Sequence, residues 1–243
     1  MSHFAIQKSN RGPKPKRIID ETWSPNLAYA VGLLASDGCL TRAQHLIDLT
    51  SIDIEQLNNY KKCLGISTKI TSKFSGIKNP AYRVQFKNVI FYHFLESVGL
   101  TPAKSRTINE VKLPNQYFFD FLRGLFDGDG CSYSYWDPRW RSSFMFYLSF
   151  TSASSLFVKW LKKKIEELSN CDGKISVNKK KDGRNPYYQL RFAKNNAKIL
   201  VQKMYYSDSS IYLSRKKLKI DRSLAIIAKQ EAMYALDKVA QVM

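Results

Sequence analysis

The chain has 243 residues, 44% of them hydrophobic, which is enough to bury the core of one large domain or two small ones. Lys and Arg number 39 against 20 Asp and Glu, a net charge of +19. This excess favours a polyanionic partner, most often nucleic acid, with a merely basic structural protein as the alternative. No apolar run reaches the roughly 18 residues of a membrane span, and the four cysteines form no CxxC pair, so neither a membrane partner nor zinc is expected. With no secretory segment either, we expect an intracellular location, in cytoplasm or nucleoid, or in an organelle matrix.

Residues 1–22 are predicted to form a basic arm. Gly12, Pro13 and Pro15 oppose regular structure there, and no acid precedes Asp20. Two interpretations stay open: a tail without a role, and a flexible arm that binds phosphates.

The next segment predicts a buried helix that ends in an acid. Ser24 followed by Pro25 is typical of an N-cap and a first helical residue, and an apolar run then continues to Asp37. An acid at a helix C-terminus faces the negative end of the macrodipole, where stability favours Lys or Arg. The pattern returns at residues 119–131 and ends at Asp129, so we infer that both carboxylates serve a function.

The order of elements is predicted to repeat. Periodicity indicates a hairpin within residues 39–50, a helix at 53–64, strands at 69–74 and 82–86, and a helix at 89–98. Residues 49–51 and 79–86 are matched by 150–152 and 185–192. We therefore predict an α+β protein of two pseudo-symmetric αββαββα repeats, at residues 23–100 and 115–243, with a linker at 101–114 and a C-terminal helix in the second repeat.

A glycine lies inside each acid-ended helix, Gly32 in the first and Gly124 in the second. Glycine within a helix costs about 0.5–1 kcal/mol relative to Ala, and close approach of two helix backbones is a reason to keep it. If the helices pair about a pseudo-twofold axis, Asp37 and Asp129 come together. Gly38 and Gly130 would then cap the helix ends.

Two adjacent carboxylates repel each other and lose hydration, and a divalent cation relieves both costs. Mg²⁺ is the expected ion, and it can support phosphodiester hydrolysis. Mn²⁺ or Ca²⁺ can substitute for binding. The alternative is that Asp-Gly marks two ordinary turns after buried helices, although its appearance in both copies of a repeat disfavours that interpretation.

Two lysines, Lys87 and Lys194, follow the fourth strand of each repeat. A lysine there is predicted to act at the scissile phosphate, by polarising water or balancing transition-state charge. A plain contact with phosphate or solvent is the alternative.

The strands predict a polar, basic outer face. Lys, Arg, Gln, Asn, Ser and Thr alternate with apolar residues along them, and these side chains read base edges and phosphates in a major groove. A solvated sheet face is the alternative, but such a face would carry more Asp and Glu. The residues predicted to bind DNA are Arg42, Gln44, Lys69, Thr71, Lys73, Arg83, Gln85, Tyr135, Arg139, Arg141, Ser143, Lys174, Ser176, Asn178, Lys180, Arg184, Gln189 and Arg191.

These residues resemble the LAGLIDADG homing endonucleases. The nine-residue family motif maps onto Ala30–Gly38 and Leu122–Gly130, with its acid at Asp37 and Asp129. Lys104-Ser105 and Tyr212–Lys217 also resemble family segments just beyond each repeat. The first motif departs from the family at Ala35 and Ser36, but not at the acid.

The resemblance implies a monomer with a saddle of two sheets in the major groove of double-stranded DNA. It implies cleavage of both strands at a long asymmetric site, short 3′ overhangs, and metal bound by the two acids with help from the carbonyls of Ser36 and Gly128. The Met1 start and the lack of a terminal His-Asn favour a free-standing, intron-encoded enzyme over an intein. A binder without cleavage, either an intron RNA maturase or a repressor, is the runner-up.

Overall fold

A computed structural model describes residues 14–73, 81–140, 143–178 and 186–240. The first repeat consists of α1 (Pro25–Asp37), β1 (Gly38–Thr41), β2 (Leu46–Ser51), α2 (Ile54–Leu64), β3 (Ile70–Lys73), β4 (Ala81–Lys87) and α3 (Val89–Ser97). The second consists of α5 (Phe118–Asp129), β5 (Cys131–Trp136), β6 (Phe144–Ser152), α6 (Ser155–Ser169), β7 (Lys174–Asn178), β8 (Tyr187–Ala193) and α7 (Lys194–Met204). The predicted αββαββα order is therefore confirmed in both halves.

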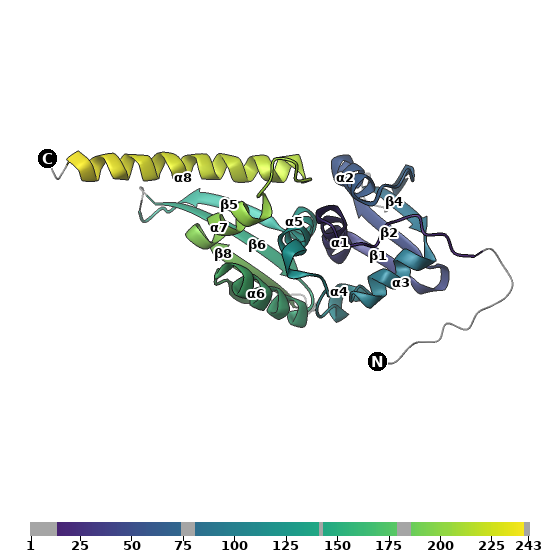
Figure 1. The fold of residues 1–243 in the computed structure, drawn as a ribbon. Coiled ribbons are helices and arrows are strands. Elements are labelled where there is room, and N and C mark those ends of the chain that lie inside the picture. Colours follow the sequence, from purple (N-terminus) through teal and green to yellow (C-terminus); the bar gives the residue numbers. More distant parts are fainter. Residues whose placement is uncertain (1–13, 74–80, 141–142, 179–185, 241–243) are drawn as a thin grey trace.

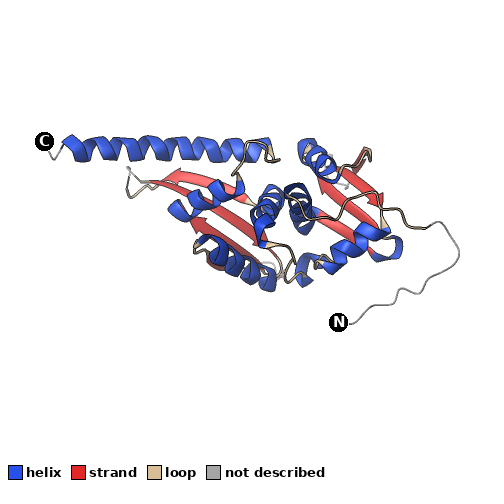
Figure 2. Cartoon of the chain, in the orientation of Figure 1, coloured by secondary structure: helices blue, strands red, loops and turns tan. Residues whose placement is uncertain are grey.

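Each repeat forms one antiparallel sheet, in the order β1-β2-β4-β3 or β5-β6-β8-β7. Figure 1 shows α1 and α5 side by side at the centre, with one sheet on either side of them. Figure 2 shows that the remaining helices cover the two sheets. Among the helices of the described residues, none has the length and apolar character needed to cross a membrane.

Additional elements lie outside the two repeats. The predicted linker contains the short helix α4 (Lys104–Thr107), and the chain ends in the long helix α8 (Ser214–Ala240). Short 3-10 turns occupy Arg42–Gln44 and Asn115–Tyr117. Part of the predicted arm lies outside the described residues, but Ile19 is buried in the core and the carbonyl of Lys16 accepts a hydrogen bond from Asn88. The described part of the arm therefore contacts the first repeat at these two residues, while residues 14–18 are exposed.

Local sequence explains how the helices begin and end. The Ser24 side chain accepts a hydrogen bond from the Leu27 amide at the start of α1, as predicted. Gly38 and Gly130 do follow the motif helices, but they are extended, with φ of −76° and −75°, rather than left-handed. At each glycine the chain passes directly from helix to strand. Glycine is needed there because a side chain would collide with the last turn of the helix. A Cβ on Gly38 would lie 2.7 Å from the Leu34 Cα.

The core lies between the motif helices and the inner faces of the sheets. Val84, Leu190 and Phe192 are fully buried, as the alternation predicts. Val177 is an exception. It alternates with Ser176 and Asn178, which predicts an inward side chain, yet it is 53% exposed on the edge strand β7. An edge strand has a neighbour on one side only, so alternation there predicts a face but not its burial.

Candidate active site

The motif helices α1 and α5 are in backbone contact. A Cβ on Gly32 would overlap the Phe121 carbonyl oxygen and lie 2.8 Å from the Leu125 nitrogen, and one on Gly124 would overlap the Tyr29 carbonyl oxygen. Only glycine permits this approach, so the prediction that these two residues lie at the helix interface agrees with the structure.

The contact brings the two motif acids to the same end of the helix pair. Burial and then the charge of Asp129 raise the pKa of Asp37 to about 6, while a hydrogen bond from Gln56 opposes the rise. Burial also raises the pKa of Asp129, against the opposing charges of Lys104 and Lys216. Each carboxylate is thus desolvated, and the negative charge of one acts on the other.

Two lysines lie beside these acids, Lys104 buried and Lys216 partly buried. The Lys104 ammonium, from α4, donates to the carbonyls of Gly38 at 2.5 Å and Ser36 at 3.4 Å. The Lys216 ammonium, from the first turn of α8, donates to the carbonyls of Phe126, Gly128 and Gly130, each at 2.7 Å. Lysines are favoured at helix C-termini, where carbonyls are unpaired. The missing basic residue of each motif helix is therefore supplied by a segment outside the repeat.

Burial lowers the pKa of both lysines, and the nearby carboxylates raise it again. Sequence reasoning did not assign either lysine to the site. The available signal was that both lie in the segments beyond each repeat that resemble family segments.

Lys216 is held in place by contacts that join the two repeats. Its neighbour Arg215 binds the Asp53 carboxylate through Nε and Nη2, at 3.0 and 2.6 Å. Asn59 donates to the Tyr212 carbonyl at 2.8 Å. The start of α8 is thus fixed to α2 of the first repeat. Lys216, in the same segment, donates to the carbonyls at the end of the second motif helix, beside Asp129.

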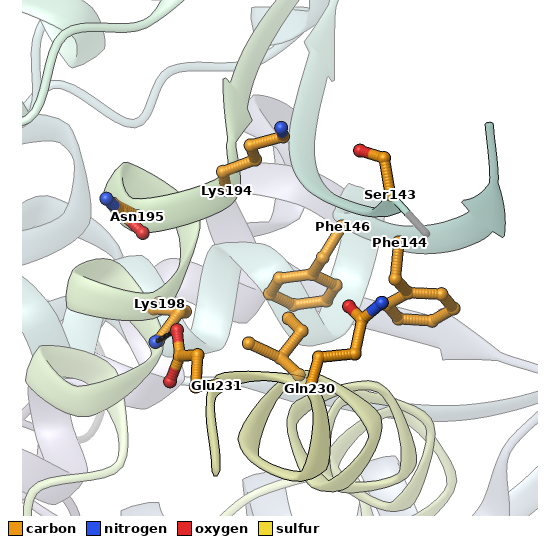
Figure 3. A pocket seen from close by; sticks show the side chains of 9 residues that line it. Ser143, Phe144, Phe146, Lys194, Asn195, Lys198, Gln230 and Glu231 are labelled. Atoms are coloured by element: carbon orange, nitrogen blue, oxygen red, sulfur yellow. Dashed lines mark hydrogen bonds and ion pairs between the residues drawn. The ribbon is translucent and has the colours of Figure 1, made fainter. Parts of the chain in front are cut away.

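The structure does not place Lys87 or Lys194 beside the acids, which corrects their predicted position. Lys87 is exposed and pairs with Leu46, at the far end of its sheet from Gly38. Lys194 begins α7 and lines a cavity of about 300 Å³ between the β5–β6 hairpin, α7 and α8 (Figure 3). An alternating strand pattern gives the face of a residue, but not its distance from the motif helix.

The remaining predicted metal ligands are the carbonyls of Ser36 and Gly128, and both accept hydrogen bonds from lysines here. A carbonyl oxygen has two lone pairs, so one bond does not exhaust it. Within the described residues, no cluster of three or more His, Cys, Asp or Glu side chains is suited to a metal. Two desolvated carboxylates and carbonyl oxygens form an all-oxygen donor set, which fits a hard divalent cation such as Mg²⁺ that keeps waters and phosphate oxygens.

The surroundings of the two acids differ. Gln56 is 2% exposed, and its Nε2 donates to Asp37 Oδ2 at 3.1 Å. The Ser51 hydroxyl donates to the Oε1 atom of Gln56 at 2.7 Å. Counting from the matched Ser51 and Ser152, Phe157 takes the place of Gln56 and lines a small apolar hollow with Asp129. The first acid is therefore held by a buried amide, whereas the second borders an apolar hollow that Phe157 also lines.

The sixth motif position also differs, with Ala35 in the first copy and Asp127 in the second. Asp127 Oδ2 accepts from the Tyr29 hydroxyl and the Leu213 amide, each at 2.7 Å. Burial raises the pKa of this carboxyl to about 6. Asp127 joins α1 to the start of α8, so this extra acid has a structural role.

The polar sheet faces extend from the acids along both repeats. Of the predicted DNA-binding residues, Thr71, Lys73, Arg83 and Gln85 lie on β3 and β4, and Lys174, Ser176, Asn178, Gln189 and Arg191 on β7 and β8. Lys69 lies just before β3, Arg42 and Gln44 in the first hairpin turn, Tyr135 on β5, and Arg139 and Ser143 around the second turn. The prediction for Arg141, Lys180 and Arg184 falls outside the described residues.

The second sheet carries an aromatic cluster on this face. The sequence shows an aromatic hairpin that includes Tyr133 and Tyr135, but not their stacking with Tyr147. The rings of Tyr133 and Tyr147 stack at 4.8 Å, and Tyr135 stacks on Tyr147 at 6.0 Å. The Arg191 guanidinium lies 5.3 Å from the centre of the Tyr147 ring. Cross-strand pairing of β5 and β6 places the tyrosines together.

Neither a protein-family model nor a curated protein matches the chain. The I-LtrWI LAGLIDADG homing endonuclease bound to target DNA superposes with a TM-score of 0.57 at 16% identity, over 90% of this chain and 96% of that one. I-DmoI in complex with DNA and Ca gives 0.51 at 12% identity, over 76% and 91%. The full-length WhiA protein from Thermatoga maritima gives 0.51 at 12%, over 90% and 71%. The chain therefore has the fold of the LAGLIDADG endonucleases, with low sequence identity.

Proposed function

We propose that this protein is a monomeric, site-specific, metal-dependent endonuclease that cuts double-stranded DNA. The observation that carries the proposal is the doubled site, in which each motif acid lies at the end of a closely packed helix with a lysine on the carbonyls beside it. A stable fold needs neither the paired acids nor their desolvation, which costs stability.

In this proposal the two sheets bind one half of the target each, and the acids lie at the junction between the halves. Asp37 and Asp129 would hold the cation, together with the Ser36 and Gly128 carbonyls. When bound, Mg²⁺ activates water and stabilises the leaving 3′-oxygen. Lys104 and Lys216, which replace Lys87 and Lys194 in this role, orient the helix ends and place positive charge where the phosphate develops negative charge.

The positions of Lys87 and Lys194, away from the two acids, fit phosphate binding better than chemistry. Lys87 is exposed at the end of β4 and shares the alternating face of Arg83 and Gln85. The net charge of +19 supports general affinity for a polyanion, which weakens with salt.

A cleavage assay with a randomised double-stranded DNA library and Mg²⁺ tests the proposal. We expect a discrete double-strand break at one long sequence with short 3′ overhangs, and no cleavage in EDTA. The D37N/D129N double variant is the matched control, because it keeps the side-chain volume and removes both charges. Unchanged cleavage by this control would refute the assignment of the acids.

A non-cleaving binder is the second candidate, in the form of an intron RNA maturase or a repressor. Its support is that the chain shares its fold with WhiA as well as with the homing endonucleases. Selective binding of one DNA or RNA sequence that stays intact in Mg²⁺ would establish the binder and exclude the nuclease.

A further inference from the structure

Gln85 and Arg191 occupy equivalent positions in the two repeats. Gln85 pairs across the sheet with Asp48, which pairs with Cys39, two residues beyond the acid Asp37. Arg191 pairs with Ser149, which pairs with Cys131, two residues beyond Asp129. Each residue is thus the same number of strands and residues from its motif acid.

The Gln85 side chain is oriented by a carboxylate. Its Nε2 donates to Asp48 Oδ2 at 2.9 Å, while Asp48 Oδ1 accepts from the Thr50 hydroxyl at 2.9 Å. Asp48 is 7% exposed and lies 3.6 Å from an Arg83 nitrogen. Because a carboxylate only accepts hydrogen bonds, the amide nitrogen of Gln85 must face it.

This orientation leaves Gln85 with a defined pair of groups. One N–H of its amide is used by Asp48, and the second N–H and the Oε1 atom complete the amide edge. A donor beside an acceptor matches adenine, which presents N7 as an acceptor and its N6 amino group as a donor in the major groove.

Arg191 is oriented by the tyrosine cluster defined by Tyr133, Tyr135 and Tyr147. Its Nη1 donates to the Tyr133 hydroxyl at 3.2 Å, and its guanidinium stacks over Tyr147. The bond to Tyr133 and the charge of that ring raise the pKa of Arg191, so the group stays charged. A guanidinium has five N–H donors and no acceptor, which matches the paired O6 and N7 acceptors of guanine.

We propose that Gln85 selects adenine and Arg191 selects guanine at two base pairs equally distant from the centre of the target. The inference rests on the proposed binding of double-stranded DNA, but it does not require cleavage. It makes the two half-sites chemically different at matching positions, because the supporting residues Asp48 and Tyr133 differ between the repeats.

The test is a binding selection from randomised duplex DNA with Ca²⁺ in place of Mg²⁺. The wild-type chain is expected to select A·T at one position and G·C at its mirror position. Arg191→Gln should shift the second towards A·T, Gln85→Arg the first towards G·C, and the double exchange should interchange them. A good bidentate contact predicts a preference of roughly five- to 150-fold at each position.

The matched control is Lys163→Gln, which removes one charge from a side chain 79% exposed on α6. It should lower affinity slightly and leave the base preferences unchanged. A discrete wild-type target whose mirror positions do not respond to the exchanges would overturn the inference and leave DNA binding intact. A wild-type chain without any sequence preference would overturn both, and melting curves of the variants would confirm that they are folded.

Discussion

The two halves of the candidate active site keep the same acid and lysine but support them differently. Each half has an acid at the end of its motif helix and a lysine that donates hydrogen bonds to the carbonyls beside it. The first acid also receives a hydrogen bond from Gln56, whereas the second borders an apolar hollow lined by Phe157. A buried acid at the sixth motif position, Asp127, is present in the second motif and not in the first. The comparison teaches that the charge and position of the acid and the lysine are the same in the two repeats. The neighbouring groups that set the pKa of each acid are different.

The largest expected effect comes from neutralising one acid at a time. Under the proposed function, Asp37→Asn and Asp129→Asn each reduce double-strand cleavage on the order of 1,000-fold or more, because a cation ligand with its charge is lost. Single-turnover assays with each strand labelled separately provide the measurement. A variant that still cuts both strands at the parental rate would show that its acid is not needed, and binding in Ca²⁺ is the control for intact DNA recognition.

Removing one lysine tests whether the lysines are equivalent. Lys104→Met and Lys216→Met are each expected to lower the cleavage rate by about 10²- to 10³-fold with smaller changes in DNA affinity. Lys216→Met should destabilise the fold more, since it loses three hydrogen bonds, and urea unfolding measures that difference. Lys194→Met is the control, with a near-parental rate expected. A large loss of rate in that control would return Lys194 to the chemistry.

Sequence alone predicted the features that depend on local pattern and internal repetition. Periodicity predicted both αββαββα repeats, and the acid-ended helices with Gly32 and Gly124 predicted the central pair. Lys104 and Lys216 could not be assigned from pattern, because they reach the acids from segments outside the repeats. The tyrosine cluster and the Gln85–Asp48 bond depend on strand register, which a single sequence does not fix.

Gln56 provides a direct test of the difference between the halves. Gln56→Leu removes the hydrogen bond that lowers the pKa of Asp37, so that pKa should rise above about 6 in the metal-free protein. A hydrogen bond to a charged group contributes about 1.5–3 kcal/mol, so about tenfold weaker metal binding is expected. Titration calorimetry with Ca²⁺ measures this affinity. Making Gln56→Leu in a chain that also carries Asp129→Asn would isolate metal binding at Asp37. Phe157→Leu is the matched control and should leave metal affinity at the first site unchanged.

The smallest expected effect is a pH dependence of stability that arises from Asp127. The pKa of this carboxyl is about 6 in the folded protein against an ordinary value of 3.8, so the folded state binds the proton more tightly. The free energy of unfolding in EDTA should therefore rise as pH falls through 6 towards 4, by about 1 kcal/mol between pH 7.5 and 5 from this group. Asp127→Asn retains an oxygen for Tyr29 and Leu213 and should remove that part of the slope. An unchanged slope would mean that the motif acids Asp37 and Asp129, whose pKa values are also raised, carry the dependence, and Asp37→Asn and Asp129→Asn, measured in the same buffers, separate their parts.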